Sequence, residues 1–106
     1  MERAQSAVRA ALGGLTFNSP AEARRYAELK SAEQAGFIHD LELQPAYPCV
    51  VNGVLVCTYR ADFRYRTKDG KEVVEDVKGN KLQVVKLKKR LVSALYPGTK
   101  ISEVRS

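Results

Sequence analysis

The sequence predicts one domain of the α/β (α+β) class, built on a central mixed β-sheet of four to five strands flanked by helices. The chain has 106 residues, which is a usual size for a single domain. Two long helical patterns are separated by short segments of alternating polar and apolar residues, bounded by Gly, Pro and Asn turn signals. This order of helix, antiparallel strands, helix and final strand is typical of helices packed against one sheet.

The first long helix is expected from Ser19 to about Ala35. Ser19 carries an N-cap side chain, Pro20 suits the first helical position, and Glu22 is placed to complete a capping box. Gly36 can adopt the left-handed conformation that ends many helices. The helix should therefore have sharp ends, with Glu22 in its first turn.

A single domain over residues 1–106 is expected to begin with an N-terminal extension, residues 1–16, that includes a short Ala-rich helix over residues 3–12. The core then covers residues 17–104. No run of about 18 apolar residues predicts a transmembrane helix. The first residues also lack the apolar core of a secretion signal, so we expect a cytoplasmic protein.

Strands and a second helix are expected along the rest of the chain. The expected strands are Phe37–Leu43, Tyr47–Val51, Val54–Tyr59, Arg60–Arg66, Lys71–Lys78 and Lys100–Val104. Apolar residues at helical spacing predict a helix over Leu82–Tyr96, which Pro97-Gly98 ends. Asn52-Gly53 and Lys68-Asp69-Gly70 are the turn signals of two hairpins.

The two cysteines, Cys49 and Cys57, flank the Asn52-Gly53 turn. A two-residue loop pairs Val51 with Val54, and this register places the cysteines on opposite faces of the hairpin. They should therefore be unable to bond to each other and should pack as reduced side chains. No metal role is expected for them, because the chain has no further cysteine and one histidine.

The chain is basic, with 18 Lys and Arg residues against 12 Asp and Glu residues and a formal net charge of +6. Such a surface binds nucleic-acid phosphates by releasing counterions, although many small proteins are basic for other reasons. Each candidate phosphate contact, taken singly, is more typical of a solvated surface charge. The candidates are Arg24, Arg25, Arg60, Arg64, Lys86, Lys88, Lys89 and Arg90.

Asp62, Asp76 and Lys78 form the pattern with the most chemical meaning. Residues two apart on a strand share a face, so Asp76 and Lys78 should point the same way. A three-residue Lys68–Gly70 loop would place Asp62 opposite Asp76, whereas a two-residue loop would place it beside Val77. Two opposed carboxylates need a counter-charge, which a divalent cation supplies. The alternative is a solvated strand in which neighbouring arginines neutralise Asp62.

Two glutamates complete the set of candidate acids. Glu22 either satisfies the helix start as a capping residue or turns toward the sheet as a third carboxylate, and the local sequence leaves both roles open. Glu75 is adjacent to Asp76 and therefore faces the other way, which indicates a structural or outward role.

These residues resemble the motifs of the PD-(D/E)xK nuclease superfamily. The matching segments are Ser19-x-x-Glu22, Tyr59-x-Ala61-Asp62-Phe63 and Glu75-Asp76-Val77-Lys78-Gly79. More closely, the chain is similar to small phage proteins related to archaeal-type Holliday junction resolvases, over residues 17 to 104. Two positions depart from the superfamily pattern, because Ala61 stands in place of its proline and Asp76 in place of its commoner glutamate.

The resemblance implies a restriction-endonuclease-like core and a metal-dependent endodeoxyribonuclease. Glu22, Asp62, Asp76 and the Val77 carbonyl would bind Mg²⁺, for which Mn²⁺ would substitute, and Lys78 would orient the attacking water. The implied substrate is branched DNA, above all four-way junctions, in the host cytoplasm if a phage encodes the chain. Alternatives are a nicking or restriction-like endonuclease on linear or flap DNA, and a non-catalytic DNA-binding module on a nuclease fold.

A resolvase makes paired cuts, so the resemblance also implies a two-fold homodimer. Apolar residues on both faces of the Tyr47–Tyr59 hairpin exceed what one small core needs. Val50, Leu55 and Tyr59 are therefore the expected dimer surface.

Overall fold

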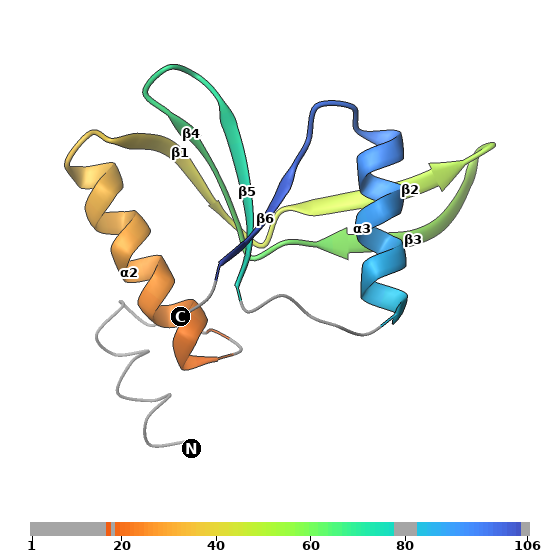
Figure 1. Cartoon of the computed structure of the whole chain (residues 1–106), viewed down its shortest axis with the longest axis horizontal. Coiled ribbons are helices and arrows are strands. Elements are labelled where there is room, and N and C mark those ends of the chain that lie inside the picture. The colour runs from red at the N-terminus through yellow and green to blue at the C-terminus, as the bar shows by residue number, and fades with distance from the viewer. Residues whose placement is uncertain (1–16, 18, 78–82, 105–106) are drawn as a thin grey trace.

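The structure, a computed structural model, describes residue 17, residues 19–77 and residues 83–104 (Figure 1). The helices are α2 (Pro20–Gln34) and α3 (Gln83–Leu95). The strands are β1 (Ile38–Leu43), β2 (Ala46–Val51), β3 (Val54–Arg60), β4 (Phe63–Thr67), β5 (Glu72–Val77) and β6 (Ile101–Val104). The helix expected over residues 3–12 and the candidate residue Lys78 lie outside the described residues.

The fold belongs to the mixed α+β class that the sequence predicts. Four strands form one sheet in the order β1-β4-β5-β6, in which β5 and β6 run parallel and the other neighbours are antiparallel. Strands β2 and β3 pair in a second, two-stranded sheet. In Figure 1, α2 lies beside the four-stranded sheet and α3 crosses the two-stranded one. Within the described ranges, neither helix has the length and apolar character needed to span a membrane.

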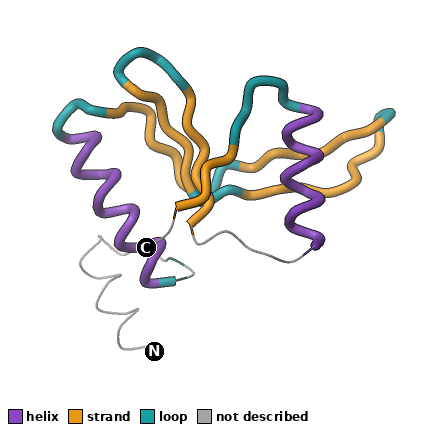
Figure 2. The backbone as a smooth tube through the Cα atoms, in the orientation of Figure 1, coloured by secondary structure: helices purple, strands orange, loops and turns teal. Residues whose placement is uncertain are grey.

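One long, bent hairpin links the two sheets (Figure 2). Its inner half is the β1–β4 pair, and its outer half, which we call the arm, is the β2–β3 pair. Two backbone bonds hold the bend, from the Gln44 N–H to the Asp62 C=O at 2.9 Å and from the Ala61 N–H to the Pro45 C=O at 3.2 Å. The predicted single strand over Arg60–Arg66 is therefore wrong, because the chain changes sheets at Ala61-Asp62.

Helix α2 begins and ends as the sequence predicts. The Glu22 N–H donates to Ser19 Oγ at 3.2 Å, which caps the first turn. Gly36 follows the helix with a φ of 84°, and the Phe37 N–H donates back to the Ala32 C=O at 2.9 Å. This closing pattern is typical of helices that end in glycine. It fixes the length of α2 and keeps Glu22 at the end that faces the bend.

Two hydrophobic clusters lie on the two sides of the bend. One packs α2 on the four-stranded sheet, and its buried members are Ala21, Leu29, Phe63, Tyr65 and Val77. The other joins α3, the arm and β5, and its buried members are Tyr47, Cys49, Tyr59, Ala61, Val74 and Val92. Asp62 lies between Ala61, which belongs to one cluster, and Phe63, which belongs to the other, so packing on both sides fixes its backbone.

The register of the arm differs from the prediction. Cys49 lies directly opposite Cys57, and a bulge separates this pair from the Val50–Leu55 pair, leaving Val56 as the extra residue. The prediction that the cysteines face opposite sides is therefore wrong, because it continued the spacing of the turn without a bulge. Both cysteines are free, and Cys49 is buried.

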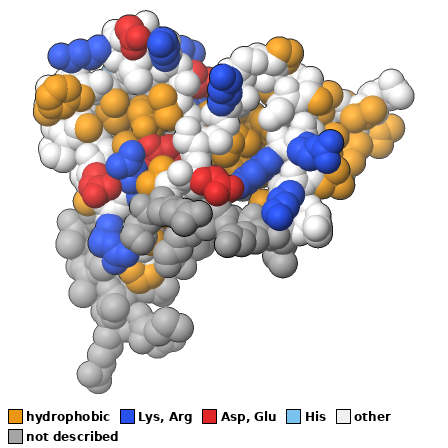
Figure 3. Space-filling model, in the orientation of Figure 1, with side chains coloured by type: hydrophobic (Ala, Val, Ile, Leu, Met, Phe, Trp, Pro, Cys, Tyr) orange, Lys and Arg blue, Asp and Glu red, His pale blue; other side chains and the backbone are white. Residues whose placement is uncertain are grey.

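Exposed apolar side chains gather at the outer end of the arm (Figure 3). They are Val50, Val51, Val54, Leu55 and Val56. Tyr59 is different, because it is 4% exposed and belongs to the cluster beneath α3. The prediction that Tyr59 belongs to a dimer surface is therefore wrong. Val50 and Leu55 are exposed, and their place in such a surface stays a prediction.

Candidate active site

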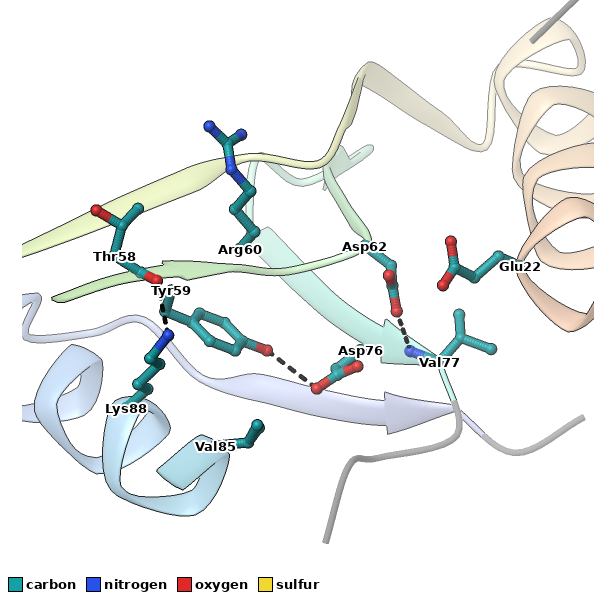
Figure 4. Close-up of a pocket in the computed structure, with 9 residues that line it drawn as sticks. All are labelled: Glu22, Thr58, Tyr59, Arg60, Asp62, Asp76, Val77, Val85 and Lys88. Atoms are coloured by element: carbon teal, nitrogen blue, oxygen red, sulfur yellow. Dashed lines mark hydrogen bonds between the residues drawn. The ribbon is translucent and has the colours of Figure 1, made fainter. Parts of the chain in front are cut away.

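An open groove of about 600 Å³ lies where the two sheets meet (Figure 4). Helix α2, strands β3 and β5, the bend and helix α3 all contribute to it. The lining residues are Glu22, Thr58, Tyr59, Arg60, Asp62, Asp76, Val77, Val85 and Lys88. The groove thus contains every acid that the sequence analysis assigned to metal binding.

Asp62 and Asp76 enter the groove from neighbouring segments of chain. Arg64 lies opposite Val74 and Phe63 opposite Glu75 in the β4–β5 pair, and the Asp62 N–H, just before β4, donates to the Glu75 C=O at 3.0 Å. The turn that sets it has Gly70 at a φ of 84°, as a three-residue loop requires. The first of the two registers left open by the sequence is therefore confirmed for Phe63 to Arg66, whereas Asp62 lies in the bend beyond the paired strand and Arg60 belongs to the arm. Both carboxylates lie on the same side of the sheet.

Asp62 is held by one backbone bond and crowded by other acids. The Val77 N–H donates to its Oδ2 at 2.6 Å. Burial and the nearby charges of Glu22 and Asp76 raise the pKa of Asp62 to about 7, although the Val77 bond acts in the opposite direction. Burial and the neighbouring carboxylates therefore disfavour the charged form of Asp62.

Asp76 makes two contacts that the sequence analysis missed. The Tyr59 hydroxyl donates to its Oδ2 at 3.1 Å, and the Lys89 ammonium lies 2.8 Å from the same oxygen. Lys89 also lies 3.4 Å from a carboxylate oxygen of Glu103 on β6. Burial and the charge of Asp76 raise the pKa of Tyr59, so its hydroxyl stays protonated and donates. Lys89, predicted as a DNA contact, is instead engaged by acids.

Glu22 joins the other acids from the first turn of α2. Its backbone N–H donates to Ser19 Oγ, which is the half of a capping box that the serine side chain makes and does not use the carboxylate. Figure 4 shows the side chain extended toward Asp62. Of the two roles left open by the sequence, the geometry favours that of a third carboxylate in the groove.

Glu75 lies on the opposite face of the sheet, as predicted, and has a structural partner there. It is 2% exposed, and Arg25 donates from Nε and Nη2 to its two oxygens at 2.8 and 2.7 Å. The Tyr65 hydroxyl donates to the same carboxylate. Arg25 also pairs with Glu28. The assignment of Arg25 as a DNA contact is corrected to a structural role, because its guanidinium is occupied.

Arg64 is corrected for the same reason. It donates to the Glu42 carboxylate and, at 3.2 Å, to the Tyr47 hydroxyl. Its guanidinium also lies 5.5 Å from the centre of the Tyr47 ring. These contacts hold the side chain against the sheet, outside the groove.

The remaining candidate cations lie at the groove or on the helix surfaces. Arg60 lines the groove, as does Lys88, whose ammonium donates to the Thr58 C=O at 3.4 Å. Arg24 is exposed on α2 and Lys86 on α3. Lys88 is one of several basic residues of α3 that the sequence offers as phosphate contacts, and helical spacing alone does not say that it is the one facing the arm.

The acids suit a partly hydrated Mg²⁺ better than a closed metal cage. Across residues 17, 19–77 and 83–104, no three His, Cys, Asp or Glu side chains stand close enough together to enclose an ion. Magnesium, however, usually keeps several waters and is held by one or two carboxylates together with substrate phosphates. Asp62 and Asp76 offer two such carboxylates on one face, with Glu22 beside them.

These observations define the class of protein: it is an α+β domain with an acid-lined groove between two sheets. The chain belongs to the family described as "Protein of unknown function (DUF1064)", which matches residues 3–106. No curated protein and no solved structure matches it significantly. The family description gives no activity, so the function has to be argued from the groove.

Proposed function

We propose that the chain is a Mg²⁺-dependent, structure-selective DNA endonuclease, and in particular a Holliday junction resolvase that hydrolyses phosphodiesters in branched DNA. The observation that carries the proposal is the convergence of Glu22, Asp62 and Asp76 in one open groove. Half-buried carboxylates that repel one another do not stabilise a fold. They are suited to holding a divalent cation.

The proposed reaction is attack of water on a phosphodiester. A bound Mg²⁺ would polarise the scissile phosphate and lower the pKa of a bound water. Asp62 and Asp76 would hold the ion, and Lys78, by its resemblance to the nuclease motif, would orient the water. The water oxygen bonds to phosphorus, the bond to the 3′ oxygen breaks, and that oxygen takes up a proton. The products are a 5′-phosphate and a 3′-hydroxyl.

DNA would be held by its backbone rather than by its bases. Arg60 and Lys88 line the groove, and Arg24 and Lys86 are exposed on the two helices. Phosphate contacts position DNA without reading its sequence. The net charge of +6 adds long-range attraction. Such binding suits an enzyme that selects its substrate by shape.

Paired cuts in a four-way junction need two sites, so we propose a two-fold homodimer. The exposed apolar end of the arm, which includes Val50 and Leu55, supports this part of the proposal. The activity would belong in the cytoplasm.

The test is Mg²⁺-dependent digestion of a synthetic four-way junction beside its separate linear arms. Wild type should cut the junction and leave the linear arms intact. Asp62→Asn should abolish cutting and bind the junction at least as well, because it removes negative charge that faces phosphate.

Three outcomes would count against the proposal. Equal cutting by Asp62→Asn and wild type would end the assignment of the groove as the catalytic site. Preferential cutting of linear or flap DNA would favour the nicking or restriction-like alternative. Junction binding by a wild type that never cuts would favour a non-catalytic binding module.

A further inference from the structure

Two donors act on the same oxygen of Asp76. The Tyr59 hydroxyl lies 3.1 Å from Oδ2, and the Lys89 ammonium lies 2.8 Å from it. Within the described part of the chain, these contacts fix one oxygen of the carboxylate and leave Oδ1 for a ligand. Figure 4 shows that the carboxyl turns one oxygen toward Tyr59.

Tyr59 is a rigid donor, because its ring is packed in a core. The ring belongs to the cluster of α3 and the arm, and its centre lies 6.4 Å from that of the Tyr47 ring. Its hydroxyl is the end that reaches Asp76 in the groove (Figure 4). A buried aromatic body with a polar tip loses little freedom when the tip forms a hydrogen bond, so Tyr59 can hold the carboxylate in one orientation.

We infer that Tyr59 is a positioning residue whose hydroxyl orients the Asp76 carboxylate for binding a divalent cation. Carboxylates that hold metals are commonly oriented by outer hydrogen bonds, and loss of such a bond typically lowers metal affinity about 10–100-fold. The inference rests on the proposed metal-dependent function. It concerns metal affinity, however, which can be measured on the protein without DNA.

Tyr47 supplies a matched control for this inference. Tyr47 is also buried and belongs to the same cluster, but its hydroxyl accepts from Arg64 and does not line the groove. Tyr59→Phe and Tyr47→Phe each remove one hydroxyl from one buried ring. They therefore differ mainly in whether an acid of the groove loses a donor.

The experiment measures binding of Mn²⁺ alone to the full chain, from the electron paramagnetic resonance signal of the free ion. Tyr59→Phe should weaken Mn²⁺ binding by about 10-fold or more, and Tyr47→Phe should leave it nearly unchanged. Tyr59→4-aminophenylalanine places a donor at the same point, so it should recover most of the lost affinity. Thermal unfolding of each variant checks that it is folded.

The outcomes separate this inference from the proposed function. Equal Mn²⁺ affinity in wild type and Tyr59→Phe overturns the inference, and the nuclease proposal stands if wild type still cuts junctions. A lower stability of Tyr59→Phe with unchanged Mn²⁺ affinity assigns Tyr59 a structural role and also overturns it. If Tyr59→Phe binds Mn²⁺ more weakly and the wild type cuts no DNA, the inference is supported and the proposed nuclease function is contradicted. A wild type that binds no Mn²⁺ overturns both.

Discussion

Asp62 is a carboxyl that the fold places where its charge is poorly stabilised. Burial and the neighbouring acids Glu22 and Asp76 raise its pKa to about 7. In the unfolded chain the same group loses its proton near pH 4. Between these two values the unfolded state has released the proton and the folded state still holds it. The free energy of unfolding therefore falls as the pH rises from about 4 to about 7.

Asp62→Asn should accordingly stabilise the metal-free protein at pH 8. The amide carries no charge, so the free energy of unfolding in EDTA should rise by about 1 kcal/mol, once solvent screening of this partly exposed group is allowed for. The gain should shrink at pH 5, where the folded wild type is protonated. Urea unfolding of wild type and variant at both pH values measures this difference in the free energy of unfolding. Asp40→Asn, at an exposed position, is the control, and an equal gain there would contradict the explanation.

At the scale of elements, the Arg25–Glu75 pair ties α2 to the four-stranded sheet. Glu75 is buried, and Arg25 bonds both of its oxygens. Removing one partner of a buried ion pair leaves the other charge without compensation. This contact therefore helps to hold the first turn of α2, and with it Glu22, beside the acids of the groove.

Arg25→Ala should lower the free energy of unfolding by about 3 kcal/mol. Arg24→Ala removes the same charge from the adjacent position, but Arg24 is exposed, so its effect should stay within about 0.5 kcal/mol. Urea unfolding of the two variants side by side is the measurement. Equal effects would show that the loss comes from net charge rather than from the buried pair.

The sequence predicted the elements whose signals are local. Ser19 and Gly36 mark the ends of α2, and Gly70 marks the turn that sets the register of β4 and β5. The bend at Ala61-Asp62 was missed because alternation continues unbroken through it. The bulge at Val56 was missed for a similar reason, since nothing near that residue departs from strand composition.

The contacts around Asp76 could not have been predicted by the same means. Tyr59 reaches it because the arm docks beside β5, and Lys89 reaches it because one side of α3 faces the sheet. Both contacts depend on how elements pack together, which strand alternation and helical spacing do not specify. The ion pairs of Arg25 with Glu75 and of Arg64 with Glu42 could not be predicted from the sequence for the same reason. The assignments of Glu22, Asp62, Asp76 and Lys78 to catalysis stay predictions.

At the scale of the whole molecule, the groove lies between two packed units, each with its own hydrophobic cluster. Glu22 comes from the side of α2, Tyr59 from the arm, and Asp62 from the bend between them. The outer end of the arm extends beyond α3 (Figure 1) and carries exposed apolar side chains (Figure 3). The site thus lies at the base of the arm, and the proposed dimer contact lies at its tip.

Val54→Lys should shift the proposed homodimer to monomer. Val54 is 62% exposed at the tip, and a charge there would have to be buried on association. Val84→Lys is a matched control, because Val84 is 56% exposed on α3 and undergoes the same change. Sedimentation velocity at matched concentrations gives the oligomeric state. A monomeric wild type, or equal dissociation of both variants, would contradict the proposal that the arm forms the dimer contact.

The facing cysteines of the arm make this protein sensitive to how it is handled. Directly opposed residues of antiparallel strands have Cα atoms about 4.5–5.5 Å apart, which is within the span of a disulfide. In air or with oxidised glutathione, Cys49 and Cys57 should therefore be able to join, with a mass loss of two hydrogens (about 2 Da) and a cross-link in the middle of the arm. Preparations kept with and without reductant would then contain chemically different molecules, and activities measured on them should not be pooled.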